Sequence, residues 1–221
     1  MTKCLKVKKM GIPVFILGES GQGKSTSMRD LDPSSTLQIQ AIHKALPFRN
    51  NWKHITRDDK SGSIMVCDKP KSICEAIIKA PSIGRDVVVV DDFQYIMANE
   101  FMRRSSEKGF DKFTEMAKGV WDIVNAAANS NCIVYLLSHT STDDRGVTRC
   151  KTVGKLLDEK ITLEGMATIV LKAVKRDGQH LFTTQTDGFD TVKSPMGMFE
   201  SNAIDNNLSL VTKAIKDYYA I

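Results

Sequence analysis

The stretch Gly18-Glu19-Ser20-Gly21-Gln22-Gly23-Lys24-Ser25-Thr26 fits the pattern G-x-x-x-x-G-K-[ST] without a gap. Glycines let the backbone of such a loop curl, so that successive N–H groups point inward at phosphate oxygens. The lysine of this pattern reaches the β- and γ-phosphates of a nucleotide, and the hydroxyl that follows it ligates Mg²⁺. The stretch therefore predicts a nucleotide-binding loop in which Lys24 contacts phosphate and Ser25 holds the metal.

The segments on either side of this loop have the character that such a site requires. The apolar run at residues 14–17 precedes the loop and predicts a buried strand, with Pro13 tolerated at its first position. A helix is expected to begin near Lys24 and to add the positive end of its dipole to the phosphate site.

Three further apolar runs are typical of strands that are buried on both faces, as parallel strands are. They lie at residues 36–42, 86–90 and 132–137. Between the last two runs, residues 111–130 place apolar side chains three and four apart, which predicts an amphipathic helix. A shorter helical piece is expected before it, at about residues 99–106.

The C-terminal third has a different pattern. Asp177-Gly178 separates two β-rich runs, at residues 167–174 and 180–184, and this dipeptide predicts a tight hairpin. Residues 208–219 predict a short helix. The whole pattern predicts an α/β fold, with a mostly parallel sheet flanked by helices and an antiparallel β-hairpin at its C-terminal edge.

Two carboxylates, Asp91 and Asp92, end the four-valine run of the third predicted strand. Asp91 is expected to hold Mg²⁺ opposite Ser25. Adjacent carboxylates repel each other unless a cation or solvent separates them, which makes Asp92, or else Gln94, the candidate to orient the attacking water. The alternative for Asp92 is a structural one, as the N-cap of the helix that follows.

His139 comes directly after the fourth predicted strand. Ligands of α/β sheets bind beyond the carboxyl ends of the strands, so we expect this side chain to face the γ-phosphate. The alternative is a solvated histidine at a strand end. Lys24, Asp92 and His139 are accordingly the predicted catalytic residues.

The overall composition excludes several classes of protein. The chain has 221 residues, 42% apolar and 26% charged, which is ordinary for a globular protein and unlike a disordered or fibrous chain. No apolar run approaches the roughly 18 residues of a membrane helix. Five cysteines without a C-x-x-C pair fit free thiols in a reducing compartment. We expect one cytoplasmic domain over residues 1–221, with its core at about 11–207 and no membrane partner.

The order of these parts resembles the RecA-like P-loop NTPase core. Four runs, DDFQYIMANEFMRR, KGFDKFTEMAKGVWDIV, KTVGKLLDEKITLEGMATIVLK and KSPMGMFE, look like the bacteriophage ATP-binding proteins of the single-strand-annealing (Sak) recombinase group. The resemblance covers about residues 11–207. It implies ATP and Mg²⁺ as cofactors, DNA-stimulated ATP hydrolysis, and a role in phage recombination with single-stranded DNA, a single-strand-binding protein and further copies of the chain.

The resemblance also assigns basic residues to two DNA loops and to a contact between subunits. Arg103 and Arg104 correspond to the first DNA loop. Residues 145–155 hold four cations and no acid, correspond to the second loop, and read either as a solvated loop or as a polyanion contact; the cations are Arg145, Arg149, Lys151 and Lys155. Three residues fall where a RecA-like core reaches a neighbour's γ-phosphate: Lys172, Lys175 and Arg176.

One departure from the RecA-like pattern leaves the activity open. RecA-like enzymes carry a catalytic glutamate after the second strand, where this chain reads Gln38-Ile39-Gln40-Ala41-Ile42-His43. Either Asp92 serves instead, or hydrolysis is slow and the protein is mainly an ATP-dependent binder. Two alternative functions remain: a helicase loader or nucleotide switch that binds a replication protein, and a small-molecule kinase with residues 145–149 as its lid.

Overall fold

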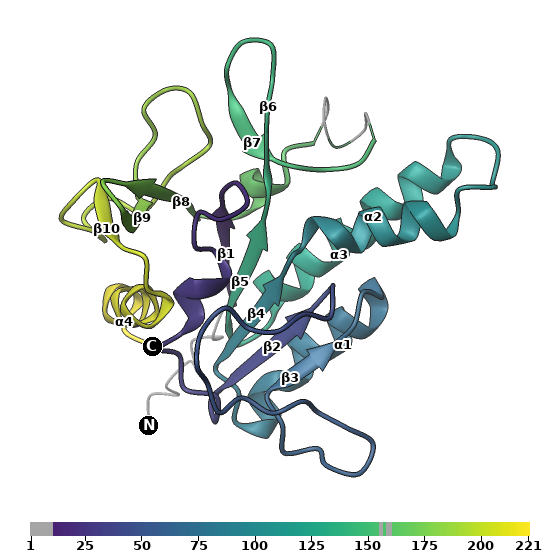
Figure 1. Ribbon diagram of the computed structural model, residues 1–221, viewed down its shortest axis with the longest axis horizontal. Coiled ribbons are helices and arrows are strands. Elements are labelled where there is room, and N and C mark those ends of the chain that lie inside the picture. The colour runs from purple at the N-terminus through teal and green to yellow at the C-terminus, as the bar shows by residue number, and fades with distance from the viewer. Residues whose placement is uncertain (1–10, 155–156, 158–160) are drawn as a thin grey trace, which may run out of the picture.

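A central sheet of eight strands organises the computed structural model, which describes residues 11–154, 157 and 161–221 (Figure 1). The strands are β1 (Ile12–Leu17), β2 (Thr36–Gln40), β3 (Ile64–Val66), β4 (Val87–Asp91), β5 (Ile133–Ser138), β8 (Ile169–Arg176), β9 (Gln179–Thr183) and β10 (Ala203–Asp205). Their order in the sheet is β10-β9-β8-β1-β5-β4-β2-β3. The strands from β8 to β3 pair in parallel, whereas β9 pairs antiparallel with both β8 and β10. The predicted fold class is therefore confirmed.

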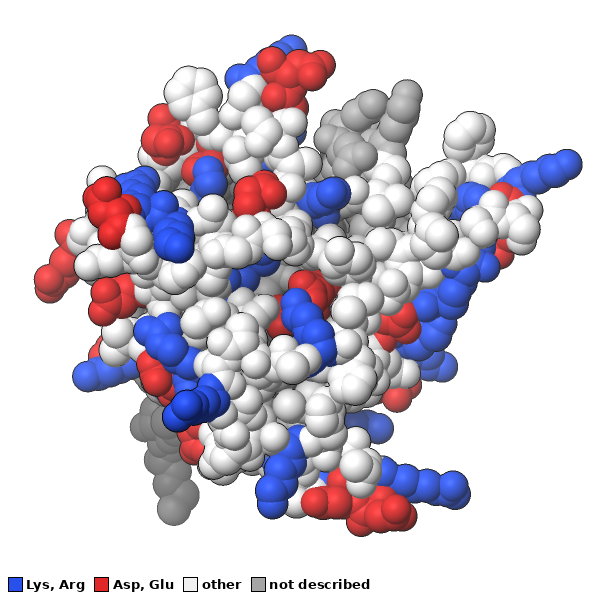
Figure 2. Space-filling model, in the orientation of Figure 1, with Lys and Arg blue, Asp and Glu red and all other residues white. Residues whose placement is uncertain are grey.

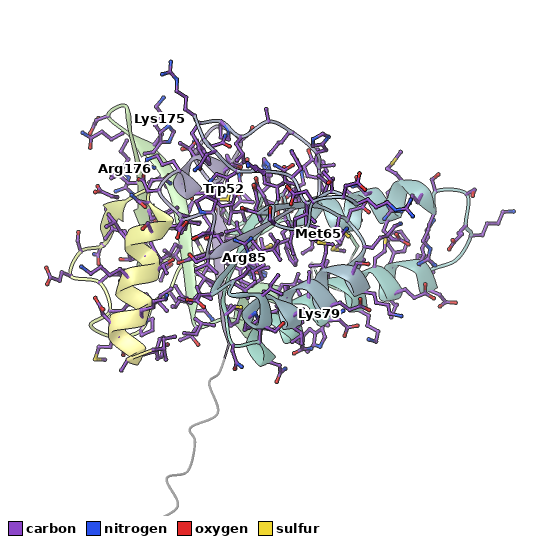
Figure 3. All side chains as sticks on the ribbon, turned by 90° about the horizontal axis from the view of Figure 1, so that it is seen from below. Trp52, Met65, Lys79, Arg85, Lys175 and Arg176 are labelled. Atoms are coloured by element: carbon purple, nitrogen blue, oxygen red, sulfur yellow. The ribbon has the colours of Figure 1, made fainter. Side chains whose placement is uncertain are left out.

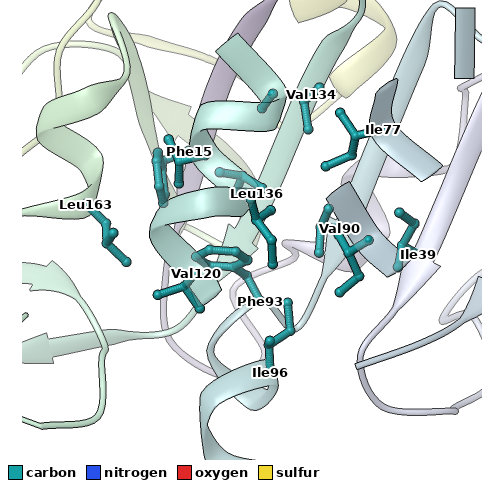
Figure 4. Close-up of a cluster of buried hydrophobic side chains, with 14 of the residues drawn as sticks. Phe15, Ile39, Ile77, Val90, Phe93, Ile96, Val120, Val134, Leu136 and Leu163 are labelled. Carbon is teal, nitrogen blue, oxygen red and sulfur yellow. The ribbon is translucent and has the colours of Figure 1, made fainter. Parts of the chain in front are cut away.

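Helices cover both faces of this sheet. They are α1 (Pro70–Lys79), α2 (Gln94–Arg103), α3 (Asp111–Asn129) and α4 (Leu208–Tyr219), with 3-10 turns η1 (Ser25–Met28), η2 (Ala80–Ile83) and η4 (Leu163–Met166). Apolar side chains of α1, α2 and α3 pack on one face in a single buried cluster, part of which is drawn in Figure 4. A second cluster fills the other face, beneath α4, η1 and Trp52. Within the described residues, no helix is long and apolar enough to cross a membrane.

Two projections leave the sheet at the edge where its parallel strands end (Figure 1). One is the pair of helices α2 and α3. The other is a hairpin of β6 (Thr140–Thr142) and β7 (Thr148–Cys150), which continues from β5 as a separate two-stranded sheet. Residues 145–155 were expected to be a loop, and that expectation is corrected in part. Thr148–Cys150 form β7, which pairs with β6, while Arg145 lies in the turn between the two strands, in which Gly146 has φ 80°.

Local signals predicted several elements well. α3 and α4 lie where the apolar spacing placed them, and Asp177 and Gly178 form the hairpin turn with φ values of 51° and 79°. A turn with both central residues at positive φ matches the twist of the flanking strands, which explains the Asp-Gly preference.

Other elements differ from expectation. The helix expected near Lys24 is only the four-residue turn η1, so that expectation is wrong. Pro33 limits how far such a helix could extend, because proline lacks the N–H that a helix needs and disfavours helical geometry in the residue before it. The helix expected at residues 99–106 is α2, five residues earlier at its start. β3 and α1 were not predicted.

Arg85 joins two loops to the sheet just before β4 (Figure 3). Its guanidinium is buried and donates hydrogen bonds to four backbone carbonyls, those of Pro33, Ser34, Ser61 and Gly62. A guanidinium carries five N–H donors in a planar fork, which suits it to several acceptors at once. Arg85 thereby fixes the segments that precede β2 and β3, next to the strand that carries Asp91.

Candidate nucleotide site

The glycine loop lies directly after β1 and curls as its composition predicted. Gly21 and Gly23 have φ values of 78° and 92°, in the left-handed region that favours glycine. A side chain at Gly23 is also excluded by space, because its Cβ would lie 2.9 Å from Nδ1 of His180. The loop therefore needs glycine at this position both for conformation and for close packing.

Lys24 is buried within this loop. Its Nζ donates to the carbonyl oxygens of Gly18, at 2.7 Å, and Glu19, at 2.9 Å. Burial lowers the pKa of Lys24 to about 8, against the opposing effect of the Asp92, Asp91 and Glu19 carboxylates. The ammonium group is thus held beside the loop by neutral carbonyl acceptors, and a phosphate can replace them with negatively charged acceptors.

Ser25 and Asp91 are brought together as predicted. The Ser25 hydroxyl donates to Oδ1 of Asp91 at 3.0 Å, and the amide Nε2 of Gln38 lies 3.5 Å from Oδ2. Burial, reinforced by the charge of Asp92, raises the pKa of Asp91. Among the described residues no cation forms an ion pair with Asp91, so a hydroxyl and a buried carboxylate supply the oxygen donors that Mg²⁺ prefers. The residues present therefore fit the predicted metal.

Asp92 does not cap a helix. α2 begins at Gln94, and the residue at its cap position, Phe93, makes no capping hydrogen bond through its side chain. Asp92 instead has φ 58° and a buried carboxylate that forms an ion pair with Lys44. The structural alternative for Asp92 is thus wrong, and its carboxylate faces the nucleotide site.

His139 also lies at this site, beyond the end of β5. Its Nε2 is 4.0 Å from Oδ1 of Asp92, and its ring lies edge-on to Tyr95 with the ring centroids 6.4 Å apart. Burial, followed by the charge of Lys24, lowers the pKa of His139. Gln94 accepts a hydrogen bond from the His139 backbone N–H at 3.2 Å, so it ties the ends of β4 and β5 together.

Four of these residues, Lys24, Ser25, Asp92 and His139, line one pocket of about 270 Å³. The sequence analysis missed two of its polar residues, Lys44 from the loop after β2 and His180 from β9, together with the neighbouring Ala45 and Pro47. His180 places Nδ1 at 3.1 Å from the carbonyl oxygen of Gln22. Neither Lys44 nor His180 belongs to a recognisable local motif. The full lining is Ser20, Gly21, Gly23, Lys24, Ser25, Thr26, Lys44, Ala45, Pro47, Asp92, His139 and His180.

The basic residues of the two predicted DNA segments differ in exposure and in whether acidic side chains pair with them. Arg103 is ion-paired with Asp68 and Glu100, and Arg104 with Glu107 and Glu115. On the β6–β7 hairpin, by contrast, Arg145 and Lys151 are exposed, and Arg149 lies 3.9 Å from Asp143. Lys155 lies outside the described residues. Figure 2 shows basic and acidic side chains interspersed over the visible face.

The three residues predicted to contact a neighbouring subunit lie on β8. Lys172 is ion-paired with Asp190 at 3.3 Å, whereas Lys175 and Arg176 are exposed (Figure 3). They line a second pocket of about 390 Å³, which also contains Glu19 and Gln22 of the glycine loop. The basic end of the β8–β9 hairpin and the glycine loop therefore face one pocket.

The pKa of Lys24 predicts how nucleotide binding depends on pH. Because the folded pKa is about 8, the ammonium loses its proton as the pH rises from 7 to 9. We expect the affinity for a nucleoside triphosphate to fall about tenfold over that range, measured by calorimetric titration. Without nucleotide, the free energy of unfolding is expected to rise between pH 8 and 10.5, since the unfolded chain binds this proton more tightly.

The Lys24→Arg variant is the control for this pH effect. A guanidinium stays protonated throughout the range, so its affinity, whatever its level, should be the same at both ends. A wild-type affinity that does not change between pH 7 and 9 would contradict the prediction.

Fold and site together define a class of fold: a mostly parallel α/β sheet with a P-loop after its first strand, arranged as in RecA-like cores, in which β5 separates the strand that leads into the glycine loop from the strand that carries Asp91. No family model and no curated protein matches the sequence. Among solved structures, the chain is similar to the KaiC-like protein PH0186 from Pyrococcus horikoshii OT3, with a TM-score of 0.47 and 12% identity over 80% of this chain and 82% of that one.

Proposed function

We propose that this protein binds ATP with Mg²⁺ and hydrolyses it. The observation that carries the proposal is the hydrogen bond between the Ser25 hydroxyl and Oδ1 of Asp91, 3.0 Å long, beside the pocket that Ser25 and Lys24 line. A glycine loop alone occurs in many contexts. A loop hydroxyl joined to a buried carboxylate from another strand is the specific arrangement that a magnesium-bound triphosphate needs.

Each side chain has a separate task in this reaction. Lys24 and the loop N–H groups would bind the β- and γ-phosphates, while Ser25 and Asp91 would hold Mg²⁺. The bound metal neutralises charge on the phosphate oxygens. Asp92 orients a water whose oxygen forms a bond to the γ-phosphorus as the bond to the β–γ bridging oxygen breaks, which yields ADP and inorganic phosphate. Neutral His139 donates a hydrogen bond to the γ-phosphate.

We further propose that single-stranded DNA stimulates this activity, in phage recombination or annealing with a single-strand-binding protein. Support comes from the position of the exposed cations. The β6–β7 hairpin begins directly after His139 and carries Arg145 and Arg149, while Lys175 and Arg176 line a pocket together with Glu19 and Gln22 of the glycine loop. Phosphate contacts of this kind are independent of base sequence. The same two β8 residues are available for a γ-phosphate of a neighbouring copy, in a homo-oligomer.

Hydrolysis assays separate this function from its rivals. The expected result is ATP hydrolysis that requires Mg²⁺ and increases when single-stranded DNA is added. Phosphoryl transfer to a nucleoside in a panel assay would indicate a kinase instead. Hydrolysis unaffected by DNA, together with nucleotide-dependent binding to a replicative helicase, would indicate a loader.

Removal of two cations from the β6–β7 hairpin tests the DNA contact. We expect Arg149→Ala combined with Lys151→Ala to weaken binding to single-stranded DNA and to lower the slope of log affinity against log salt by about 1.4, since each lost contact releases about 0.7 fewer counterions. Fluorescence anisotropy at several salt concentrations measures both. The matched control, Lys79→Ala with Lys213→Ala, removes two exposed lysines from α1 and α4. If the slope for the Arg149→Ala, Lys151→Ala variant is unchanged, these two residues of the hairpin do not contact DNA.

A second candidate, an ATP-dependent switch that binds a protein partner, is favoured by one observation. At the end of the α2–α3 projection, Met102 and Phe110 are 68% and 85% exposed, while the neighbouring Arg103 and Arg104 are ion-paired. An apolar tip with neutralised cations suits a protein surface better than a phosphate backbone.

A further inference from the structure

Lys44 brings a second lysine into the nucleotide pocket. It comes from the loop after β2, and its backbone is held by a buried neighbour, because Nε2 of Gln40 donates to the Lys44 carbonyl at 3.1 Å. Its side chain lines the pocket and forms an ion pair with Asp92. The anchored backbone sets where the side chain enters, while 40% of the side chain stays exposed and free to adjust.

The charges around the pocket explain why a second cation is needed. Asp91 and Asp92 are buried neighbours, and the glycine loop adds Glu19. A triphosphate brings further negative charge, and its γ-phosphate would face Asp92. Like charges at close range in a partly buried site cost free energy unless a cation lies between them. His139 does not supply this cation, because burial lowers its pKa and favours the neutral ring.

Lys44 is suited to bridge these two anions. An ammonium has three N–H donors, and the contact with Asp92 leaves donors for a phosphate oxygen in the same pocket. Partial burial lowers the pKa of Lys44, but the hydrogen bond to Asp92 and the nearby carboxylates outweigh this effect and raise it. Lys24, by contrast, donates hydrogen bonds to the carbonyl oxygens of Gly18 and Glu19, the two residues that follow β1.

We propose that Lys44 is a second phosphate-binding lysine of this site, which bridges Asp92 and the γ-phosphate and so makes the protein select nucleoside triphosphates over diphosphates. The inference rests on the proposed nucleotide binding and deepens it. In the nucleotide-free protein, Asp92 holds the ammonium in place. When a triphosphate is bound, the ammonium donates to a γ-phosphate oxygen as well, whereas a diphosphate offers no acceptor there.

Binding of ATPγS and ADP to the full chain tests this role without reliance on hydrolysis. With Mg²⁺ present, Lys44→Met is expected to weaken ATPγS binding about tenfold, which corresponds to about 1.4 kcal/mol, and ADP binding less than about twofold. Lys44→Arg should keep most of the selectivity, because it keeps the charge. Lys53→Met, an exposed lysine of the same loop, is the matched control and should bind both nucleotides as the wild type does.

A double-mutant cycle separates phosphate binding from mere neutralisation of Asp92. In an Asp92→Asn background there is no carboxylate to neutralise, so a purely neutralising Lys44 would have no remaining effect on affinity. We expect Lys44→Met still to weaken ATPγS binding about tenfold in that background. Loss of the effect there would overturn the proposal, even if the single variant behaves as expected.

The wild-type protein distinguishes failure of this inference from failure of the proposed function. If it binds neither nucleotide, the proposed function is wrong. If it binds ATPγS in a way that Lys24→Ala abolishes, and Lys44→Met leaves the ratio of ATPγS to ADP affinity unchanged, only the role of Lys44 is wrong. Thermal unfolding of each variant, followed by circular dichroism, verifies that the fold is retained.

Discussion

Lys24→Ala is expected to lower ATP hydrolysis by at least about 100-fold and to remove measurable triphosphate binding. The loss of one preorganised donor at a site of developing charge costs about 10²–10³ in rate. At this site the donor is also a full positive charge in a partly desolvated pocket, where electrostatic interactions are stronger than in water. Steady-state hydrolysis and calorimetric titration with ATPγS measure the two effects.

The folded state should tolerate this substitution well. Burial of the Lys24 ammonium opposes folding, as its lowered pKa indicates. Its two acceptors are carbonyls of a loop whose tip is exposed, so water can replace the lost donor. We therefore expect the unfolding midpoint to stay close to that of the wild type. Lys53→Met, outside the pocket, should retain full hydrolysis. Hydrolysis that persists in Lys24→Ala would mean that this pocket is not the site of the reaction.

Arg85→Met is expected to lower the free energy of unfolding by about 3–5 kcal/mol, the largest effect on stability that the structure predicts. The substitution keeps an unbranched apolar stem but leaves the carbonyls of Pro33, Ser34, Ser61 and Gly62 without these donors. Unsatisfied buried polar groups cost about 1–3 kcal/mol each, and partial access of water to the outer loops moderates the sum.

Urea unfolding followed by circular dichroism measures this loss as a lower midpoint at an unchanged slope. The matched control is Lys79→Met, at the end of α1, which replaces an exposed cation near the same edge of the sheet and should change stability by less than about 0.5 kcal/mol (Figure 3). If the free energy of unfolding of Arg85→Met differs from that of the wild type by less than about 0.5 kcal/mol, the four hydrogen bonds contribute little to stability.

Much of the site followed from short-range patterns. The glycine loop, the strand before it and Asp91 at the end of four valines were all identified from neighbouring residues, because each signal is complete within about ten positions. The geometry of parallel strands then required that the ends of β1, β4 and β5 share one edge of the sheet. The pairing of Ser25 with Asp91, 66 residues apart, is the consequence.

The sequence-based expectations were wrong where other parts of the chain outweighed a local conformational preference. A helix after Lys24 was expected by analogy with the usual strand, loop and helix order, but the chain turns after Met28 and proceeds to Pro33. Asp92 was a reasonable N-cap from its position before an apolar helical run. Its partner, however, is a lysine that lies 48 positions earlier, and no local pattern reports such a contact.

Residue spacing and hydrophobic pattern were thus sufficient for six of the eight strands of the sheet, for α3 and α4 and for the core of the phosphate site, since these depend on neighbouring side chains and backbone preferences. The short strands β3 and β10 were not predicted. The sequence did not show which charged side chains are exposed, ion-paired or buried, because this depends on the tertiary structure. Lys44 enters the pocket and Arg103 and Arg104 are neutralised because loops and helices that are distant in sequence pack together. Coulomb interactions depend on distance in space, which the order of residues along the chain does not specify.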